Sequence, residues 1–497
     1  KYGITYIKMT PEILFSNVFH QKKTEHMSLV SRVPPLDLLY AREKVRHLAQ
    51  GYLLDANNLK LQPRDHVKTI RDVNPGMLFL SFDICALGPA LDILEMIKND
   101  DTVICVLGMF PTTSPEFILE SGCVDFVIRG EPERRIEYLV DAFTRLHDQH
   151  GDAKSLRYAL KRDIAKALWK KTIDGISFSD KGKTTISQPM MMIEDLDTLP
   201  IPKRKDQRDK RFGSYRYENP FAKDITVMRI HRGCPHSCSY CDAKNIYGKR
   251  LRRRSVENVM EEIKSCILEG IRSIAFIDHT FTEDREWTLR FCKEMRERNL
   301  HRKLTWIAMT RIDCIDRPLM ENMRKAGCIM VGLGIERSTM SGITNIRKGI
   351  AIREVKKRLT EAREAGILTM GYFIIGFPDE TENGLLRLKR FIMDLPLDFI
   401  QVSYATPLPG TSFFRECSDW DLIKENDLRE YRFLQRSVLT TRLGQERLHA
   451  IRKDIFRTFY FSPAKGIGRV WRIIRHPGIS KVHVCRYAMR LAMQSFS

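Results

Sequence analysis

Residues 231–241 read His-Arg-Gly-Cys-Pro-His-Ser-Cys-Ser-Tyr-Cys and contain three cysteines, Cys234, Cys238 and Cys241, at the spacing C-x3-C-x2-C. The six residues before them, 225–230, are mostly apolar and β-branched, which predicts a buried strand. Thiolates are soft ligands that bind iron–sulfur clusters, zinc or copper(I). A strand that leads into three closely spaced cysteines therefore predicts a metal site in this loop.

The number of ligands separates two kinds of metal site. A structural zinc site normally has four protein ligands, and the loop supplies three cysteines. His236 is the candidate for a fourth ligand, but it lies between Cys234 and Cys238, where the loop has little room to turn its ring inward. We therefore favour an iron–sulfur cluster over structural zinc, because three cysteines leave one iron open for a small molecule.

The cysteine spacing, with Tyr240 directly before the third cysteine, resembles the motif of the radical S-adenosylmethionine superfamily. The resemblance implies that Cys234, Cys238 and Cys241 hold a [4Fe-4S] cluster, whose open iron binds the amino and carboxylate groups of S-adenosylmethionine. In that family one electron from the reduced cluster cleaves the sulfonium and gives a 5'-deoxyadenosyl radical. An electron donor such as flavodoxin or ferredoxin is implied as a partner.

Downstream of the cysteines, helix-like and strand-like segments alternate to about residue 411 and predict a partial or full β/α barrel. Such barrels carry their chemistry at the carboxyl ends of the strands. The predicted strands are 273–277, 304–308, 329–332, 368–375 and 399–404, and the predicted helices are 255–269, 284–298, 316–326, 353–365 and 382–393.

Polar and glycine residues follow these predicted strands in an order and spacing that resemble the cobalamin-binding branch of the same superfamily. The resemblance covers roughly residues 34–411. It implies that Glu336 accepts hydrogen bonds from ribose hydroxyls and that Gly376 lets the backbone approach the adenine. It also implies that Asp278 lies near the methionine ammonium and that Arg311 pairs with the methionine carboxylate. A surface salt bridge remains the alternative for Glu336, and a role outside the site remains open for Asp278 and Arg311.

Upstream, strand-like segments at 52–55, 77–82, 103–107 and 124–128 alternate with helical ones, which predicts a doubly wound, Rossmann-like parallel sheet. This region resembles the cobalamin-binding domain of the family, and the resemblance implies that Ser81 and the Gly108 loop face the corrin and its nucleotide tail. The Asp-x-His-x-x-Gly motif is absent, and Met109 replaces the usual second glycine. Cobalamin is thus predicted, with a domain used only for packing or substrate docking as the alternative.

The 497-residue chain is too long for one ordinary domain. We predict an α/β chain with a Rossmann-like cobalamin-binding-type domain over 1–150, a linker over 151–222, a radical S-adenosylmethionine barrel over 223–415 and a helical region over 416–497.

Of the twelve cysteines only three are clustered, so no disulfide framework is expected. This cysteine usage favours the cytoplasm over secretion.

The net charge of +21 is concentrated in part near the end of the chain, where residues 464–497 contain seven lysines and arginines and no acid. Two interpretations are open: a basic amphipathic tail that contacts the inner face of a membrane, or a helix packed on the barrel with a solvated basic face. The tail also suggests a lipid-like substrate. No nucleic-acid-binding module is recognisable, so we do not expect nucleic acid as a partner.

The predicted function is that of a radical S-adenosylmethionine enzyme that abstracts hydrogen from a carbon of a small-molecule or lipid-like substrate, followed by methylation or by cyclisation. A methylthiotransferase is the rival within this class, and it needs a second cluster, for which Cys85, Cys105 and Cys123 are the available cysteines. A non-catalytic metal-binding or nucleic-acid-binding regulator is the rival from another class.

Overall fold

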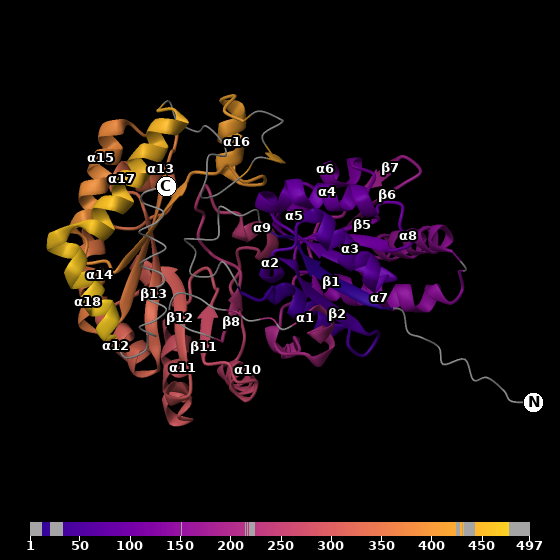
Figure 1. Cartoon of the computed structure of the whole chain (residues 1–497), viewed down its shortest axis with the longest axis horizontal. Helices are drawn as coiled ribbons and strands as arrows, with labels where there is room; N and C mark the ends of the chain where they lie inside the picture. Colours follow the sequence, from indigo (N-terminus) through magenta and orange to yellow (C-terminus); the bar gives the residue numbers. More distant parts are fainter. Residues whose placement is uncertain are drawn as a thin grey trace, which may run out of the picture. The chain divides into compact units, whose positions relative to one another are not determined.

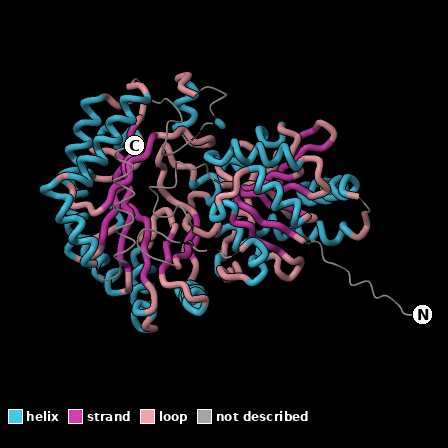
Figure 2. Tube along the Cα trace, viewed as in Figure 1, coloured by secondary structure: helices cyan, strands magenta, loops and turns pink. Residues whose placement is uncertain are grey.

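The computed structural model describes residues 12–19, 33–150, 152–213, 215, 217, 224–423, 428–429, 431 and 443–476. The chain divides into two compact units. The first comprises residues 1–20, 35–194 and 198–215, and the second comprises 21–34, 195–197 and 216–497. Each unit has strands at its centre and helices around them (Figures 1 and 2). The predicted α/β class is therefore confirmed for both.

The first unit is built on a seven-stranded sheet in the order β2-β1-β3-β4-β5-β6-β7. The first five strands are parallel, and β6 and β7 are antiparallel. The strands are β1 (Ile13–Asn17), β2 (Gly51–Asp55), β3 (Met77–Ser81), β4 (Val103–Leu107), β5 (Phe126–Ile128), β6 (Ile176–Asp180) and β7 (Lys183–Thr185). The predicted Rossmann-like sheet is confirmed, with β1, β6 and β7 as additions to the four predicted strands.

Helices cover both faces of this sheet. Phe15 and Phe79 lie on the face that packs against α1 (Leu36–Lys44), α7 (Glu133–His147) and α8 (Ala153–Trp169). Successive side chains of a strand point to opposite faces, so the intervening Leu14 and Leu78 point to the other face, and both are fully buried as well. Helices α3 (Pro63–Val73) and α4 (Leu87–Ile97) contact each other and bury apolar side chains. The doubly wound arrangement follows from strands that are apolar on both faces.

The segment 151–222, predicted as a linker, folds largely as part of the first unit. Helix α8 buries Leu156, Leu160 and Ile164, which are spaced by four residues, so its basic side chains lie on a different face. Strand β6 then extends the sheet beside β5. The remaining predicted domain boundaries stay predictions.

The charge run at 203–211 is anchored to the first unit by Asp209, while Lys203, Lys205 and Lys210 are exposed. The fully buried guanidinium of Arg42 binds the carboxylate of Asp209 and donates to the carbonyl of Lys203 at 2.8 Å. The other carboxylate oxygen of Asp209 accepts from the backbone N–H of Leu53 at 2.9 Å. Helix η3 (Gln207–Phe212), which carries Asp209, is thereby held against β2.

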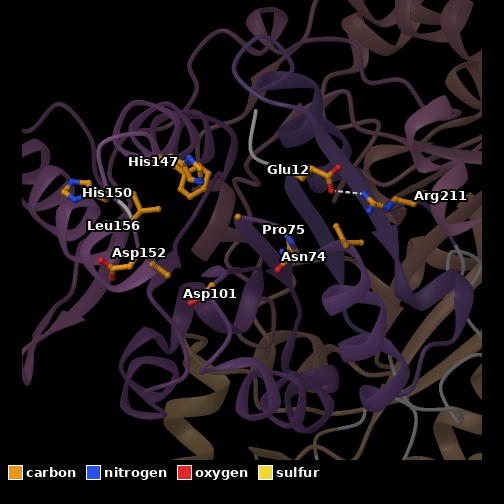
Figure 3. A pocket seen from close by; sticks show the side chains of 13 residues that line it. Glu12, Asn74, Pro75, Asp101, His147, His150, Asp152, Leu156 and Arg211 are labelled. Carbon is orange, nitrogen blue, oxygen red and sulfur yellow. Dashed lines mark hydrogen bonds and ion pairs between the residues drawn. The ribbon is translucent and has the colours of Figure 1, made fainter. Parts of the chain in front are cut away.

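A cavity of about 680 Å³ opens at the edge of the first sheet where Glu12 and Gly76 directly precede β1 and β3 (Figure 3). The ion pair between Glu12 and Arg211, 2.8 Å long, lies on one side, and His147 on the other. This is the amino-terminal edge of the parallel strands, whereas ligands of open α/β sheets bind at the carboxyl edge. We therefore assign no ligand to this cavity.

The second unit contains a six-stranded, entirely parallel sheet in the order β15-β14-β13-β12-β11-β8. Within the described residues its two outermost strands do not pair with each other, so the sheet is an open, partial barrel. The strands are β8 (Ile225–Met228), β11 (Ser273–Phe276), β12 (Thr305–Arg311), β13 (Cys328–Glu336), β14 (Leu368–Ile375) and β15 (Phe399–Tyr404). This confirms the predicted barrel.

Amphipathic helices connect these strands and lie along one side of the sheet (Figure 1). They are α10 (Val256–Leu268), α11 (Arg285–Glu297), α12 (Arg317–Lys325), α14 (Ile352–Glu364) and α15 (Glu382–Asp394). An aromatic cluster joins strands to helices: the ring of Trp306 on β12 lies 5.6 Å from Phe276 on β11 and 5.5 Å from Phe291 on α11. Burial of such large rings stabilises the packing of the strands against the helices.

The C-terminal helices complete the exposed edge of β15. Tyr460 of α17 (Gln445–Phe461) exchanges hydrogen bonds through its hydroxyl with the N–H and C=O of Ile400, at 3.1 and 3.2 Å. Arg452 of the same helix donates to the carbonyl of Val402 at 2.8 Å. Side chains thus satisfy backbone groups that a further strand would otherwise bind.

Part of the predicted basic tail forms α18 (Pro463–Arg475), and residues 477–497 lie outside the described residues. Arg469 donates to the carbonyl of Leu397 at 3.1 Å, and Arg472 binds Asp398 at 3.0 Å. These two cations pack on the second unit, as the packed-helix interpretation predicts. No helix in the described part of the chain is long and apolar enough to cross a membrane.

Candidate active site

The cysteine loop begins after β8 at a position where only glycine fits. Gly233 has φ +90°, and a Cβ added there would lie 2.0 Å from the carbonyl oxygen of Arg250. The backbone N–H of the next residue, Cys234, donates to the carbonyl of Gly248 at 3.2 Å. A close backbone crossing therefore fixes where the first cysteine starts.

The middle of the loop is held at Ser239, between the second and third cysteines. Its N–H donates to the carbonyl of Ile346 at 3.0 Å, and its carbonyl accepts from the N–H of Phe413 at 3.0 Å. Phe413 belongs to α16 (Ser412–Asp419), and Ile346 follows α13 (Met340–Asn345). Two distant segments of the second unit therefore position Cys238 and Cys241.

The three loop cysteines differ from most other cysteines in exposure. Cys234, Cys238, Cys241 and Cys314 are partly exposed, whereas the remaining cysteines in the described ranges are buried. Burial raises the pKa of the Cys234 thiol, and it raises that of Cys241 to about 12. A bound cation favours the deprotonated form of its ligands, and the donor set of this loop fits an iron–sulfur cluster held by three cysteines.

Asp278 follows β11 and is buried beside the start of the cysteine loop. Its Oδ1 accepts from the backbone N–H groups of Ile230 and His231, both at 2.9 Å. Its Oδ2 has no hydrogen-bond partner among the described residues, and burial raises its pKa. The carboxylate thus fixes the strand-to-loop junction with one oxygen, and its predicted contact with the methionine ammonium stays a prediction.

Arg311, at the end of β12, is largely engaged by its own chain. Its guanidinium makes two hydrogen bonds to the carboxylate of Asp313, at 3.0 and 2.7 Å, and one to the carbonyl of Lys348 at 2.8 Å. A methionine carboxylate would therefore compete with Asp313 for this cation. The predicted role of Arg311 stays a prediction.

Glu336, the last residue of β13, forms a buried ion pair. It does not form the surface salt bridge that was the alternative to a role in binding ribose. It is 6% exposed, and its Oε1 lies 2.9 Å from Nζ of Lys348. Lys348 also donates to the hydroxyl of Tyr240 at 3.3 Å, which links Glu336 to the cysteine loop. The backbone of Glu336 has φ +68°, in the left-handed region. The sequence analysis did not predict the role of Lys348. It lies twelve residues after Glu336, and no local sequence pattern identifies it as the partner of that carboxylate.

Gly376 follows β14 with φ +94° and donates its N–H to the carboxylate of Glu380. Burial raises the pKa of Glu380 to about 7, although Arg337 opposes this shift. Arg337 makes hydrogen bonds of 3.1 and 3.0 Å to Asp379 and lies 3.4 Å from Glu380. It thereby ties the loop after β13 to the loop after β14.

Ser81 and Gly108 lie in the first unit, at the ends of the neighbouring strands β3 and β4. The carbonyl of Ser81 accepts from the N–H of Val18 at 3.1 Å. Gly108 has φ +122°, and a Cβ there would lie 2.2 Å from the carbonyl oxygen of Phe82. The glycine is thus required by this chain's own backbone, and both residues stand at the carboxyl edge, where ligands of such sheets bind.

His66 is not a candidate axial ligand for cobalt. It is fully buried, its Nε2 lies 2.8 Å from Oγ of Ser16, and burial lowers its pKa to about 4. His236, the candidate fourth zinc ligand, hydrogen-bonds Glu283 through Nε2 at 2.9 Å. Neither histidine therefore changes the predicted ligand set of three cysteines.

Comparison with known proteins gives concordant matches. Residues 228–392 match the Radical SAM superfamily. An uncharacterized methyltransferase of Pyrococcus horikoshii is 28% identical over 436 residues, which cover 86% of this chain and 88% of that protein. The anaerobic magnesium-protoporphyrin IX monomethyl ester cyclase of Cereibacter sphaeroides is 26% identical over 348 residues, covering 69% of this chain and 53% of that protein.

A solved structure is similar to this one across both units. It is the radical S-adenosylmethionine methyltransferase TsrM from Kitasatospora setae, with cobalamin and a [4Fe-4S] cluster bound. The TM-score is 0.65 at 16% sequence identity, and the match covers 83% of this chain and 78% of that chain. At this identity the likeness concerns the fold.

Proposed function

Because this chain belongs to the cobalamin-binding branch of the radical S-adenosylmethionine superfamily, we propose that it methylates a carbon of a small organic or lipid-like molecule. The observation that carries the proposal is the 28% identity to an uncharacterized methyltransferase over 86% of the chain. That similarity extends over residues of both units, as a methylase with two cofactor domains requires. The chain is a radical S-adenosylmethionine enzyme, and the methyl transfer is the finer statement that needs a test.

Cys234, Cys238 and Cys241 would hold the [4Fe-4S] cluster, since they are partly exposed and their loop is fixed at Gly233 and Ser239. When bound, the cluster supplies the electron that cleaves S-adenosylmethionine. The protein's part would be to supply three thiolates and to leave the fourth iron without a protein ligand.

Four residues at the carboxyl ends of the barrel strands would bind S-adenosylmethionine. Glu336 would accept from the ribose hydroxyls with the carboxylate that Lys348 orients. Gly376, which has positive φ at a strand end, would let the backbone approach the adenine. Asp278 would accept from the ammonium through its unpartnered Oδ2, and Arg311 would donate to the carboxylate.

Ser81 and Gly108 would face cobalamin at the carboxyl edge of the first sheet. Cobalamin supplies, when bound, a transferable methyl group. Because His66 is held inside the unit by Ser16, we propose that it does not ligate the cobalt.

For the remaining partners, we propose flavodoxin or ferredoxin as the electron donor and a cytoplasmic location, with the residues beyond 476 as a peripheral membrane contact.

The test is anaerobic reconstitution with iron and sulfide, with and without hydroxocobalamin, followed by an absorbance spectrum and a 5'-deoxyadenosine assay. We expect retained corrin absorbance together with deoxyadenosine formation that disappears in Cys238→Ala. Failure of the wild-type protein both to form deoxyadenosine and to retain corrin would overturn the proposal.

Cyclisation is the second candidate, because the magnesium-protoporphyrin monomethyl ester cyclase is 26% identical over 69% of this chain. Deoxyadenosine formation without retained corrin would favour it. Against the methylthiotransferase alternative, Cys85, Cys105 and Cys123 are all buried and lie in separate segments of the first unit. Iron analysis separates a methylthiotransferase from the other two candidates: one [4Fe-4S] cluster gives about four irons per chain, and the two clusters of a methylthiotransferase give about eight.

A further inference from the structure

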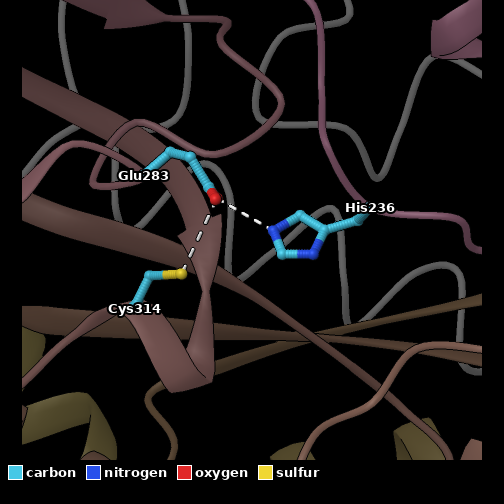
Figure 4. A group of neighbouring side chains, drawn as sticks. All are labelled: His236, Glu283 and Cys314. Carbon is cyan, nitrogen blue, oxygen red and sulfur yellow. Dashed lines mark hydrogen bonds and ion pairs between the residues drawn. The ribbon is translucent and has the colours of Figure 1, made fainter. Parts of the chain in front are cut away.

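Three side chains with different donor atoms meet beside the cysteine loop of the second unit (Figure 4). Nε2 of His236 lies 2.9 Å from Oε2 of Glu283, and Sγ of Cys314 lies 3.8 Å from the same oxygen. The three donor atoms all lie within 4.8 Å of one another. Figure 4 shows the imidazole and the thiol approaching the carboxylate from two sides.

The three donors come from separate segments at one end of the barrel. His236 belongs to the cysteine loop after β8, Glu283 precedes α11 in the connection from β11, and Cys314 ends η5 (Ile312–Cys314) directly after β12. All three segments therefore follow carboxyl ends of neighbouring strands, where barrels of this type place chemistry. Outside the cysteine loop, Cys314 is the one partly exposed cysteine in the described part of the chain.

From this geometry we propose that His236, Glu283 and Cys314 form a mononuclear site for a divalent cation of the zinc class. Zinc takes nitrogen, carboxylate and thiolate ligands at about 2.0–2.3 Å in tetrahedral geometry, which places N and O about 3.4 Å apart and S and O about 3.6 Å apart. The observed separations of 2.9 and 3.8 Å differ from these by at most about half an ångström. Small side-chain movements would complete the cage.

The charge of the donor set matches such a cation. On binding, the Cys314 thiol gives its proton to solvent and forms the metal–sulfur bond. A thiolate, a carboxylate and a neutral imidazole together carry two negative charges, which a divalent ion neutralises. Three protein ligands leave the fourth tetrahedral position to water or to an oxygen or nitrogen of a substrate, as in open zinc sites.

Metal analysis of the full-length holoenzyme tests the proposal. The protein with its cluster reconstituted is incubated with one equivalent of Zn²⁺, desalted, and analysed for zinc and iron. We expect one zinc per chain beside the cluster irons. Cys314→Ala should lose the zinc and keep the irons, and Glu283→Gln should weaken zinc binding by about tenfold or more.

The matched control is Cys123→Ala, because Cys123 also contacts a carboxylate, with Sγ 3.2 Å from Oε2 of Glu95, but belongs to no such three-donor group. This variant should keep the zinc. Co²⁺ in place of Zn²⁺ gives a second readout: a thiolate-to-cobalt absorption band in the control that is absent in Cys314→Ala.

Three results would overturn the proposal. The first is that the wild-type holoenzyme binds no zinc. The second is that Cys314→Ala binds as much zinc as the Cys123→Ala control. In the third, Cys314→Ala would lose iron or change the electron paramagnetic resonance spectrum of the reduced cluster, which would make Cys314 a cluster ligand. If Cys314→Ala does not fold, His236→Ala with the cobalt readout decides the question by the same criteria. Loss of S-adenosylmethionine cleavage in wild type would test the proposed function separately, since zinc binding does not require it.

Discussion

The ion pair between Lys348 and Glu336 is buried, because both side chains are less than 10% exposed. Its members are therefore single residues on which the stability of the site depends. Removing one member of such a pair leaves an uncompensated buried charge and costs about 3–5 kcal/mol. We therefore expect Lys348→Met to lower the free energy of unfolding by about that amount, as measured by denaturant titration.

The exposed pair between Lys389 and Asp454, 2.6 Å long, serves as the control. Lys389→Met should cost no more than about 1 kcal/mol, since solvent screens a surface pair. Equal effects of the two substitutions would contradict the importance assigned to Lys348. A double variant Lys348→Met/Glu336→Leu should recover part of the loss, because it leaves no unpaired charge.

Glu380 gives the site a pH dependence of stability. Burial raises its pKa from 4.5 to about 7, so between these values the folded state binds more protons than the unfolded state. Stability must then fall as pH rises through this window, by about 3 kcal/mol in total. Thermal unfolding at pH 5 and pH 8 should show this loss in the wild type and a much smaller one in Glu380→Gln.

The exposed Glu382 supplies the comparison, because its pKa is lowered by its hydrogen bond to Arg447 and it does not titrate between pH 5 and 8. Glu382→Gln should retain the wild-type dependence on pH. A wild-type profile that is flat from pH 5 to 8 would refute the role of Glu380.

Single residues were predictable where local spacing carries the chemistry. The three cysteines follow from C-x3-C-x2-C, and Gly376, named from the resemblance, has positive φ after β14. Lys348 and the group of His236, Glu283 and Cys314 depend on contacts between residues far apart in sequence. No local pattern marks such partners.

At the scale of elements, prediction succeeded where apolar patterns are long and flanked by clear breaks. Strands β14 (368–375) and β15 (399–404) have the predicted bounds. Strand β1 (Ile13–Asn17) was missed, because only three apolar residues begin it and the sequence around it has no helical or strand period. Its place between β2 and β3 comes from long-range pairing, which short segments do not reveal.

The contact of α17 with β15 gives a prediction at the same scale. Tyr460→Phe removes the hydroxyl that satisfies both backbone groups of Ile400, so the substitution should cost about 1–3 kcal/mol. Hydrogen exchange of the Ile400 amide should accelerate with it. Tyr158→Phe, at an exposed ring, is the control and should change neither quantity. Unchanged exchange at Ile400 would show that the hydroxyl does not protect this edge.

For the whole molecule, the division into two units predicts that the two cofactors bind independently. Cys238→Ala, in the second unit, should lose the cluster irons and keep corrin absorbance. Gly108→Ala, in the first unit, places a Cβ 2.2 Å from the Phe82 carbonyl oxygen and should lose corrin while keeping the irons. Iron and corrin analysis of the two variants checks this, and loss of both cofactors in either variant would contradict it.

The strand order of the second sheet has a consequence for synthesis on the ribosome. Each new strand from β11 to β15 pairs beside the strand made before it, so the side of the sheet opposite β8 always ends in an unpaired edge while it grows. That edge is covered only when Arg452 and Tyr460 have emerged. The nascent chain is therefore open to mispairing with other strands until its last helices are made, and a chaperone has most to protect during that interval.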